Sequence, residues 1–249
     1  MANTSKVIDL NCDLGEGHED EKLFPYISSC NIASGGHYGD RDSIKKTIIA
    51  ALKNDVSIGI HPGYPDKENF GRISLDLPLQ DLKFSLEKQI ELFINVCDEI
   101  GTKPTHVKPH GALYNDLASD YNLSLETLST INKLLPDIII YGLAHSATHQ
   151  AAQQLDIKCI NEVFADRTYT KEKKLVSRKK EGSVISDWPQ MKTQIDGLLK
   201  GEISTIEGEK ISLKAQSICL HGDSPNAAAN SKRIYEYVKA QDYAIRSYS

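Results

Sequence analysis

The stretch THVKPHGALYN, residues 105–115, shows the pattern that decides the fold. A strand-like run, His106–Pro109, carries a lysine and a proline and is followed at once by a histidine and a glycine, where the chain must turn. Other short apolar runs predict further strands, most of which end in ionisable side chains. These runs are Val7–Asn11, Ser29–Ala33, Ser57–His61, Ile138–Leu143, Lys158–Ala165 and Gln216–His221.

Helical patterns separate the strand-like runs. The clearest follows Pro78, where apolar residues from Leu79 to Ile100 recur every three or four positions and form one stripe. Gly101 stands where a helix commonly ends. Another helix is predicted to start with Ser224 as its N-cap and Pro225 at its first position. The remaining predicted helices are Asp42–Asn54, Leu123–Leu134, Ser146–Leu155 and Trp188–Lys200.

The alternation of strands and helices predicts parallel strands joined by helical crossovers. About seven such units in 249 residues favour one domain over residues 1–249, a (β/α)7-like, TIM-type barrel, with a doubly wound open sheet as the alternative. A long basic loop over residues 166–182 is either a solvated loop or a lid. Alternating polar and apolar residues near 202–215 predict a small peripheral hairpin.

The composition excludes several classes of protein. Charged residues make up 25% and hydrophobic residues 40%, which is typical of a globular chain, and the net charge of -5 gives no attraction to nucleic acid or an anionic membrane. No apolar run approaches the roughly 20 residues of a membrane helix, and the first residues lack the apolar core of a signal peptide. Five scattered cysteines without a CxxC pair indicate reduced thiols and a cytoplasmic location.

Polar and ionisable residues recur at or just after the predicted strand ends. In a parallel barrel the carboxyl ends of all strands meet at one face, so we expect these groups to share one pocket. A single strand-end histidine or aspartate commonly serves a turn or a cap, but gathering many ionisable groups at one face is costly unless they have a function. The candidates are Asp13, Glu16, Asn31, His37, His61, Lys108, His110, Asp166, Arg167, His221 and Asp223.

The residues leave the chemistry of this pocket open. Asp13, His61 and His110 come from three strands and suit a divalent metal, although no HExxH pattern supports one. Without a metal, a carboxylate would act as general base on water while Lys108 or a histidine stabilises the oxyanion. Glycine-rich turns at DLGEG and ASGGHYGD could bind an anion, but the chain contains neither GxxxxGK[ST] nor GxSxG.

Six segments together resemble one family. They are IDLNCDLGEG, CNIASGGHYGD, GIHPGYPDKENFGR, HVKPHGALYN, EVFADRTY and SICLHGDSPNA, which occur in this order between residues 8 and 228. The set is similar to the LamB/YcsF family, the A subunits of bacterial ATP-dependent 5-oxoprolinase. The resemblance implies a barrel like that of the glycoside hydrolase/deacetylase superfamily. It also implies opening of 5-oxo-L-proline (pyroglutamate) to L-glutamate, with hydrolysis of ATP as co-substrate, in a complex with subunits B and C.

Roles for individual residues follow from the resemblance as hypotheses. The expected catalytic residues are Asp13, His61, Lys108, His110, Asp166 and His221. The expected substrate- or phosphate-binding residues are Glu16, Asn31, His37, Arg167 and Asp223. Two rival readings remain: an autonomous metal-dependent amide hydrolase, such as a carbohydrate deacetylase, and a non-catalytic subunit that binds substrate or holds the B and C partners together.

Overall fold

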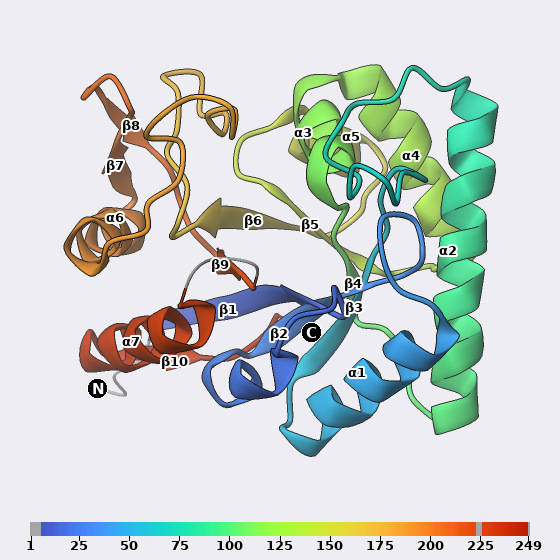
Figure 1. Cartoon of the computed structure of the whole chain (residues 1–249). Helices are drawn as coiled ribbons and strands as arrows, with labels where there is room; N and C mark the ends of the chain where they lie inside the picture. The colour runs from blue at the N-terminus through green and yellow to red at the C-terminus, as the bar shows by residue number, and fades with distance from the viewer. Residues whose placement is uncertain (1–5, 223–225, 249) are drawn as a thin grey trace.

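Seven parallel strands close into a barrel in this computed structural model, which describes residues 6–222 and 226–248 (Figure 1). The last of these strands, β9, pairs back onto the first, β1, so the sheet has no open edge between them. The predicted TIM-type barrel is therefore confirmed over the open sheet. The barrel strands are β1 (Lys6–Leu14), β2 (Ser29–Ala33), β3 (Ser57–His61), β4 (His106–Val107), β5 (Ile139–Leu143), β6 (Cys159–Phe164) and β9 (Ser217–His221).

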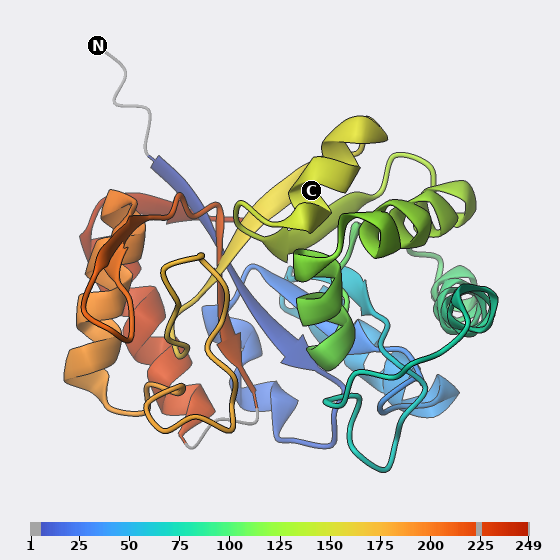
Figure 2. The same cartoon turned by 90° about the horizontal axis from the view of Figure 1, so that it is seen from above.

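Helices surround the barrel (Figure 2). They are α1 (Arg41–Lys53), α2 (Leu79–Ile100), α3 (Gly111–Ser119), α4 (Tyr121–Leu134), α5 (Ala147–Gln154), α6 (Trp188–Lys200) and α7 (Ala227–Ala240). Local sequence sets their ends. Asp40 and Ser43 form a capping box at the start of α1, and α2 begins after Pro78 and ends at the left-handed Gly101, as predicted. Two short 3-10 turns, Asp20–Lys22 and Phe24–Tyr26, follow β1.

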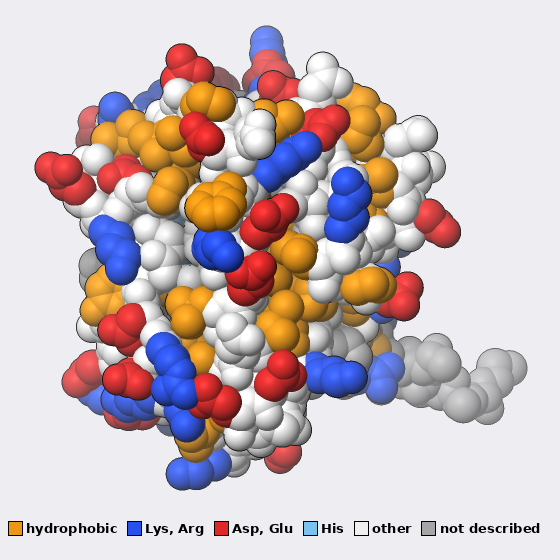
Figure 3. Space-filling model, turned by 90° about the vertical axis from the view of Figure 1, so that its right-hand side faces the viewer, with side chains coloured by type: hydrophobic (Ala, Val, Ile, Leu, Met, Phe, Trp, Pro, Cys, Tyr) orange, Lys and Arg blue, Asp and Glu red, His pale blue; other side chains and the backbone are white. Residues whose placement is uncertain are grey.

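The apolar core lies mainly between the outside of the barrel and the helices. In α2, the predicted stripe is buried through Leu86, Ile90 and Phe93, whereas Phe84 on the opposite face is 60% exposed. Each fully buried side chain of this size contributes about 1.5–3 kcal/mol relative to exposure. Figure 3 shows acidic and basic side chains interspersed over the face that α2 covers, so this face carries no field of a single sign.

The barrel interior is polar along β1. Asp9, Asn11 and Asp13 alternate with Leu10 and Cys12, and successive strand residues point to opposite faces of a sheet. Asn11 donates hydrogen bonds to Glu162 of β6 and Ser217 of β9, across the inside of the barrel. Asp9 accepts from Ser28, Ser29 and Ser217, and burial raises its pKa. The polar residues of β1 thus form a row inside the barrel that ends with Asp13 at the carboxyl end of the strand.

Several elements depart from the sequence-based expectations. Helix α3 was not predicted, and it begins directly after the strand-end pattern of residues 106–110. Strand β10 (Tyr243–Ile245) was not predicted either; it pairs in parallel with the amino-terminal part of β1, outside the closed barrel. Ser224, Pro225 and Asp223 lie outside the described residues, and α7 begins at Ala227.

Three further features complete the fold. Strands β7 (Glu202–Ser204) and β8 (Lys210–Ser212) pair antiparallel beside α6. All five cysteines are free thiols, in agreement with the expectation of reduced cysteines. Within residues 6–222 and 226–248, no helix has the length and apolar character that crossing a membrane requires.

Candidate active site

A cavity of about 580 Å³ opens at the carboxyl ends of the barrel strands. Asp13 of β1 and His221 of β9 are register partners on neighbouring strands, and both line this cavity. Helix α3 and residues 174–179 of the loop after β6 line it as well. Six of the predicted site residues line the cavity: Asp13, His61, Lys108, His110, Arg167 and His221. The predicted convergence of strand-end groups is thus confirmed for these residues.

Lys108 is the buried cation of the cavity floor. It follows β4 and is only 2% exposed. Its Nζ donates to Asp13 Oδ1 at 2.8 Å, lies 2.9 Å from Glu162 Oε1 and is 3.2 Å from Cys219 Sγ. Burial opposes the charge, but the neighbouring carboxylates outweigh it and raise the pKa of Lys108 well above its ordinary value. Lys108 is therefore a fixed ammonium at the bottom of the cavity.

Asp13 is held from three directions. Besides Lys108, Asn31 Nδ2 donates to its Oδ1 at 2.8 Å, and His61 Nε2 lies 3.3 Å from its Oδ2. Burial would raise the pKa of this carboxyl, yet the charges of His61 and Lys108 outweigh burial and hold it well below the ordinary value. Asp13 is consequently ionised and fixed in orientation, with its second oxygen directed towards His61.

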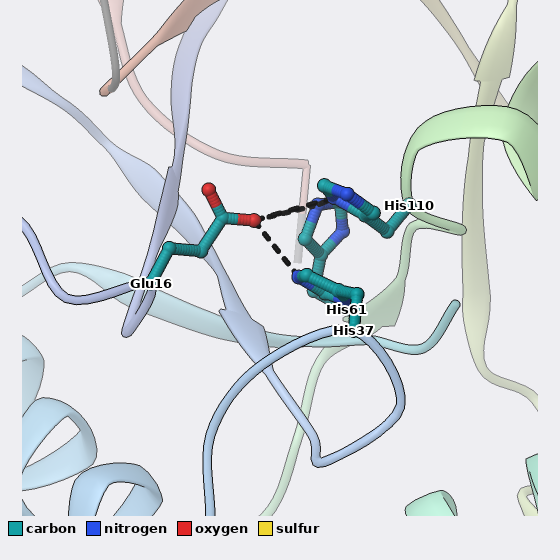
Figure 4. A group of neighbouring side chains, drawn as sticks. All are labelled: Glu16, His37, His61 and His110. Atoms are coloured by element: carbon teal, nitrogen blue, oxygen red, sulfur yellow. Dashed lines mark hydrogen bonds and ion pairs between the residues drawn. The ribbon is translucent and has the colours of Figure 1, made fainter. Parts of the chain in front are cut away.

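A second cluster lies beside Asp13 and consists of Glu16, His37, His61 and His110 (Figure 4). Glu16 Oε1 is 2.9 Å from His37 Nε2, 3.2 Å from His110 Nδ1 and 3.8 Å from His61 Nε2. The rings of His37 and His110 stack with centroids 3.5 Å apart. All four residues are buried, and one ligand atom from each lies within 4.8 Å of the others.

The backbone determines which ring nitrogens face the centre of this cluster. His61 Nδ1 is 2.7 Å from the carbonyl oxygen of Lys108, and His110 Nε2 is 2.9 Å from that of Phe70. A carbonyl only accepts hydrogen bonds, so each of these nitrogens carries the proton. Burial lowers the pKa of His61, but the neighbouring Asp13 carboxylate outweighs burial and raises it, so Nε2 can take up a second proton when no cation is bound. When both rings are neutral, as binding of a cation requires, the other two nitrogens are unprotonated. They lie 3.0 Å apart, beside the Glu16 carboxylate.

Such a convergence of lone pairs fits a divalent metal ion. Metal-bound histidines commonly donate their second N–H to a backbone carbonyl, as His61 and His110 do here. Three imidazoles and a carboxylate form a donor set typical of zinc and related ions. The charge fits too, because three buried carboxylates (Asp13, Glu16, Glu162) face one ammonium at the floor.

The four residues of this cluster differ from the expected metal ligands, which were Asp13, His61 and His110. Glu16 and His37, which we expected to bind substrate or phosphate, lie at its centre together with His61 and His110. Asp13 lies at its edge and is engaged by Lys108 and Asn31. Gly71 makes the close packing possible, because a Cβ at this position would lie 2.8 Å from the Cβ of His37.

His221, which is paired with Asp166, forms another part of the cavity lining. His221 Nδ1 lies 3.0 Å from both carboxylate oxygens of Asp166, and Phe164 stacks on its ring. The carboxylate fixes Nδ1 as the protonated nitrogen, so Nε2 is available for proton exchange. His221 is partly exposed, unlike the histidines of the buried cluster.

Other predicted residues support the floor or the loop. Asn31, as described, orients Asp13. Arg167 donates from Nε to the carbonyl of Ser183 and from Nη2 to that of Val176, so part of its guanidinium holds the basic loop in place. Asp223, expected to bind substrate or phosphate, lies outside the described residues.

A supporting hydrogen-bond network inside the barrel was not predicted from the sequence. His106 Nε2 lies 2.9 Å from Asn31 Oδ1, and Asn31 in turn donates to Asp13 and Asn11. Glu162 completes this network through Lys108. Alternation along the strands was the available signal, because Asn11 lies two positions before Asp13 and His106 two positions before Lys108.

The fold and the site define a parallel α/β barrel with an ionisable pocket at its strand ends. The model of the LamB/YcsF family matches residues 8–249, and the chain belongs to this family. The barrel also has the same general fold as the catalytic domain of a peptidoglycan N-acetylglucosamine deacetylase from Eubacterium rectale ATCC 33656. That likeness has a TM-score of 0.51 and 11% identity, over all of this chain and 91% of the other.

Relatives that bear the name of the A subunit of 5-oxoprolinase are similar over nearly the whole chain. The relative from Histophilus somni (strain 129Pt) is 39% identical over 97% of this chain and 99% of its own length. The relative from Bacillus cereus (strain AH187) is also 39% identical, over 92% and 93%. The crystal structure of a lactam utilization protein from Thermus thermophilus superposes with a TM-score of 0.90 at 26% identity, over 97% of this chain and all of that one.

Proposed function

We propose that this chain is the A subunit of an ATP-dependent 5-oxoprolinase, and that it opens 5-oxo-L-proline to L-glutamate in a complex with subunits B and C. The family and the names of relatives similar over nearly full length support this role. The structural observation that carries it is the floor of the cavity, where Asp13, His61 and Lys108 meet at the strand ends. An anionic substrate with an unreactive amide needs such a combination of a fixed cation and proton-transfer groups.

The reaction adds water across the lactam bond. The water oxygen bonds to the carbonyl carbon, the C–N bond breaks, and the ring nitrogen leaves as an amine after taking a proton. Transfer of the γ-phosphoryl group of ATP to the lactam oxygen, with release of ADP, would weaken the amide resonance beforehand. Breaking the C–N bond then leaves an acyl phosphate on the glutamate side chain. A second water molecule cleaves this acyl phosphate, so that phosphate leaves as the side-chain carboxylate forms.

The two walls of the cavity divide the proton transfers between them. On one wall, the His61–Asp13 pair orients the attacking water and accepts its proton, while the Lys108 ammonium stabilises negative charge on the substrate oxygen. On the other wall, His221 Nε2 delivers a proton to the departing nitrogen, and Asp166 fixes the ring. Arg167 retains N–H groups beyond its two carbonyl contacts and can hold the substrate carboxylate.

A divalent ion held by Glu16, His37, His61 and His110 would supply Lewis-acid activation of water or of a substrate oxygen. This cluster also favours a second candidate function, that of an autonomous metal-dependent amide hydrolase. The two functions differ in their requirements. The 5-oxoprolinase function needs ATP and the partner subunits, whereas the amide hydrolase function needs only bound metal.

The test is glutamate formation from 5-oxoproline by the complex reconstituted with B and C, with and without ATP. We expect Asp13→Asn and His110→Ala to abolish ATP-dependent glutamate release while the complex still assembles. Asp98→Asn, an exposed aspartate near the end of α2, is the matched control and should turn over normally. Unchanged turnover in both site variants would refute the proposal, and loss of assembly alone would indicate a non-catalytic subunit.

A further inference from the structure

The cavity extends well beyond its ionisable floor. A single five-membered lactam with one carboxylate fills only part of about 580 Å³, a volume within the range that accommodates drug-sized ligands. The outer part is lined by α3 on one side and by residues 174–179 of the loop after β6 on the other. In Figure 1, this loop (yellow to orange) and α3 (green) lie on the same side of the barrel.

The outer wall is strongly cationic. Lys174, Arg178 and Lys179 line it, together with Arg167 further in. Asp13 is the only carboxylate among the described residues that line the cavity, and Lys108 already engages it. The outer part of the cavity is therefore positive and has no acidic residue of its own within the described chain.

The three loop cations are not engaged in ion pairs. Across residues 6–222 and 226–248, no ion pair involves Lys174, Arg178 or Lys179, whereas the next residue, Lys180, pairs with Glu207 outside the cavity. Burial and the positive charge of Arg178 lower the pKa of Arg167 to about 10. The two guanidinium groups are therefore close enough to repel each other. Glu172 lies near Lys174 but does not line the cavity; its pKa is lowered first by hydrogen bonds with Thr170 and its own backbone, and then by the charges of Lys171 and Lys174. Cations that form no ion pair within the described residues favour binding of an anion.

The loop backbone that carries these cations is held in place. Arg167 donates to the carbonyls of Ser183 and Val176, and Thr168 donates from its backbone N–H to the carbonyl of Ser183. Val176 is buried, so the backbone between Lys174 and Arg178 is anchored against the protein. The long side chains remain exposed and can adjust to a ligand.

We propose that Lys174, Arg178 and Lys179, with Arg167 behind them, form a subsite for a phosphoryl group. This subsite lies in the outer part of the cavity that has Asp13 and Lys108 at its floor. A phosphate dianion offers several acceptor oxygens to guanidinium and ammonium donors, whereas the one carboxylate of 5-oxoproline can engage only part of this set. The inference rests on the proposed function and deepens it. The phosphoryl group comes either from the nucleotide or from a phosphorylated lactam.

The test is binding of inorganic phosphate and pyrophosphate to the purified full-length chain by calorimetry at constant ionic strength. We expect saturable binding that weakens by about tenfold in the Arg178→Gln/Lys179→Gln double variant. Lys180→Gln, the adjacent cation outside the cavity, should bind as the unchanged chain does. Absence of saturable binding, or equal weakening in Lys180→Gln, would overturn the subsite.

Two additional arms identify the source of the phosphoryl group. A non-hydrolysable ATP analogue that binds more tightly than pyrophosphate and competes with it supports a nucleotide. Phosphate binding that 5-oxoproline strengthens supports a phosphorylated lactam. Asp13→Asn separates this inference from the proposed function, because that variant should lose turnover and keep phosphate binding. If phosphate fails to bind but turnover still requires Asp13, the proposed function stands and the subsite does not.

Discussion

The floor of the cavity and its mouth, the outer part lined by Lys174, Arg178 and Lys179, both carry charged groups but hold them in opposite ways. At the floor, Lys108 is buried between Asp13 and Glu162, at distances set by three strands. At the mouth, Arg178 and Lys179 stand exposed on a loop, and no carboxylate in the described part of the chain pairs with either. Buried charges without partners are costly, whereas exposed ones are not. The floor is thus suited to chemistry at fixed positions, and the mouth to recognition of a mobile anion.

The difference between the two regions is tested most strongly by replacing one lysine in each of them. Lys108→Met leaves Asp13 and Glu162 as buried carboxylates without their cation, so we expect a loss of about 3–5 kcal/mol in the free energy of unfolding. Lys179→Met removes an exposed cation and should change it by about 0.5 kcal/mol or less. Urea unfolding of both variants measures the difference. Equal losses would contradict the division into floor and mouth.

The second prediction compares the two regions by kinetics in the reconstituted complex. His221→Gln removes the proton donor of the cavity wall, and we expect kcat to fall by about 10²-fold or more. Arg178→Gln removes an anion contact at the mouth, and it should mainly raise KM for the phosphorylated substrate or for ATP. Steady-state assays that vary ATP and 5-oxoproline separately distinguish these effects. A fall in kcat for Arg178→Gln with KM unchanged would show that Arg178 takes part in the reaction and not only in anion binding.

The third prediction concerns metal at the floor. Elemental analysis of the purified chain should find about one divalent ion per chain, because three imidazoles and a carboxylate converge there. His37→Gln should lower this content, whereas His145→Gln, a more exposed histidine outside the main cavity, should not. Chelation should lower the melting temperature of the unchanged chain, since a bound ion stabilises the folded state. A metal-free chain that chelator leaves unaffected would show that the cluster holds protons instead.

A pH-dependent effect is expected from His106 beneath the floor. Burial, followed by the charge of Lys108, lowers the pKa of His106 to about 3. The unfolded chain therefore binds up to one more proton at this residue between about pH 3 and the ordinary value of 6.5, so stability falls as the pH is lowered through this range. His106→Gln should make the free energy of unfolding less dependent on pH there. An unchanged slope would mean that His106 binds its proton equally well in the folded and the unfolded protein.

Much of the fold could be predicted from short-range patterns. The strand over Ser57–His61 and the helix over Trp188–Lys200 match their predictions because period and end signals agree there. Helix α3 was missed because its pattern follows directly after a strand end, and β10 because three residues carry too little periodicity. The strand starting at His106 is shorter than predicted, since Pro109 cannot donate to a sheet.

The candidate site was predictable in its location but not in its internal pairing. Topology alone brings strand ends together, so Asp13, His61 and His110 could be grouped from the sequence. Which residue contacts which depends on side-chain packing between segments far apart in the chain. Glu16 was expected to bind substrate or phosphate, and its position among three histidines was not foreseen. The hydrogen bonds of Arg167 to the loop backbone were not foreseen either.

The most direct test of the central claim is ATP-dependent release of glutamate from 5-oxoproline by the reconstituted complex carrying Asp13→Asn. The substitution keeps the size of the side chain and removes the charge that faces Lys108 and His61. We predict an assembled complex whose turnover is lower by about 10²–10⁴-fold. An assembled complex that releases glutamate at the unchanged rate would show that lactam opening takes place elsewhere.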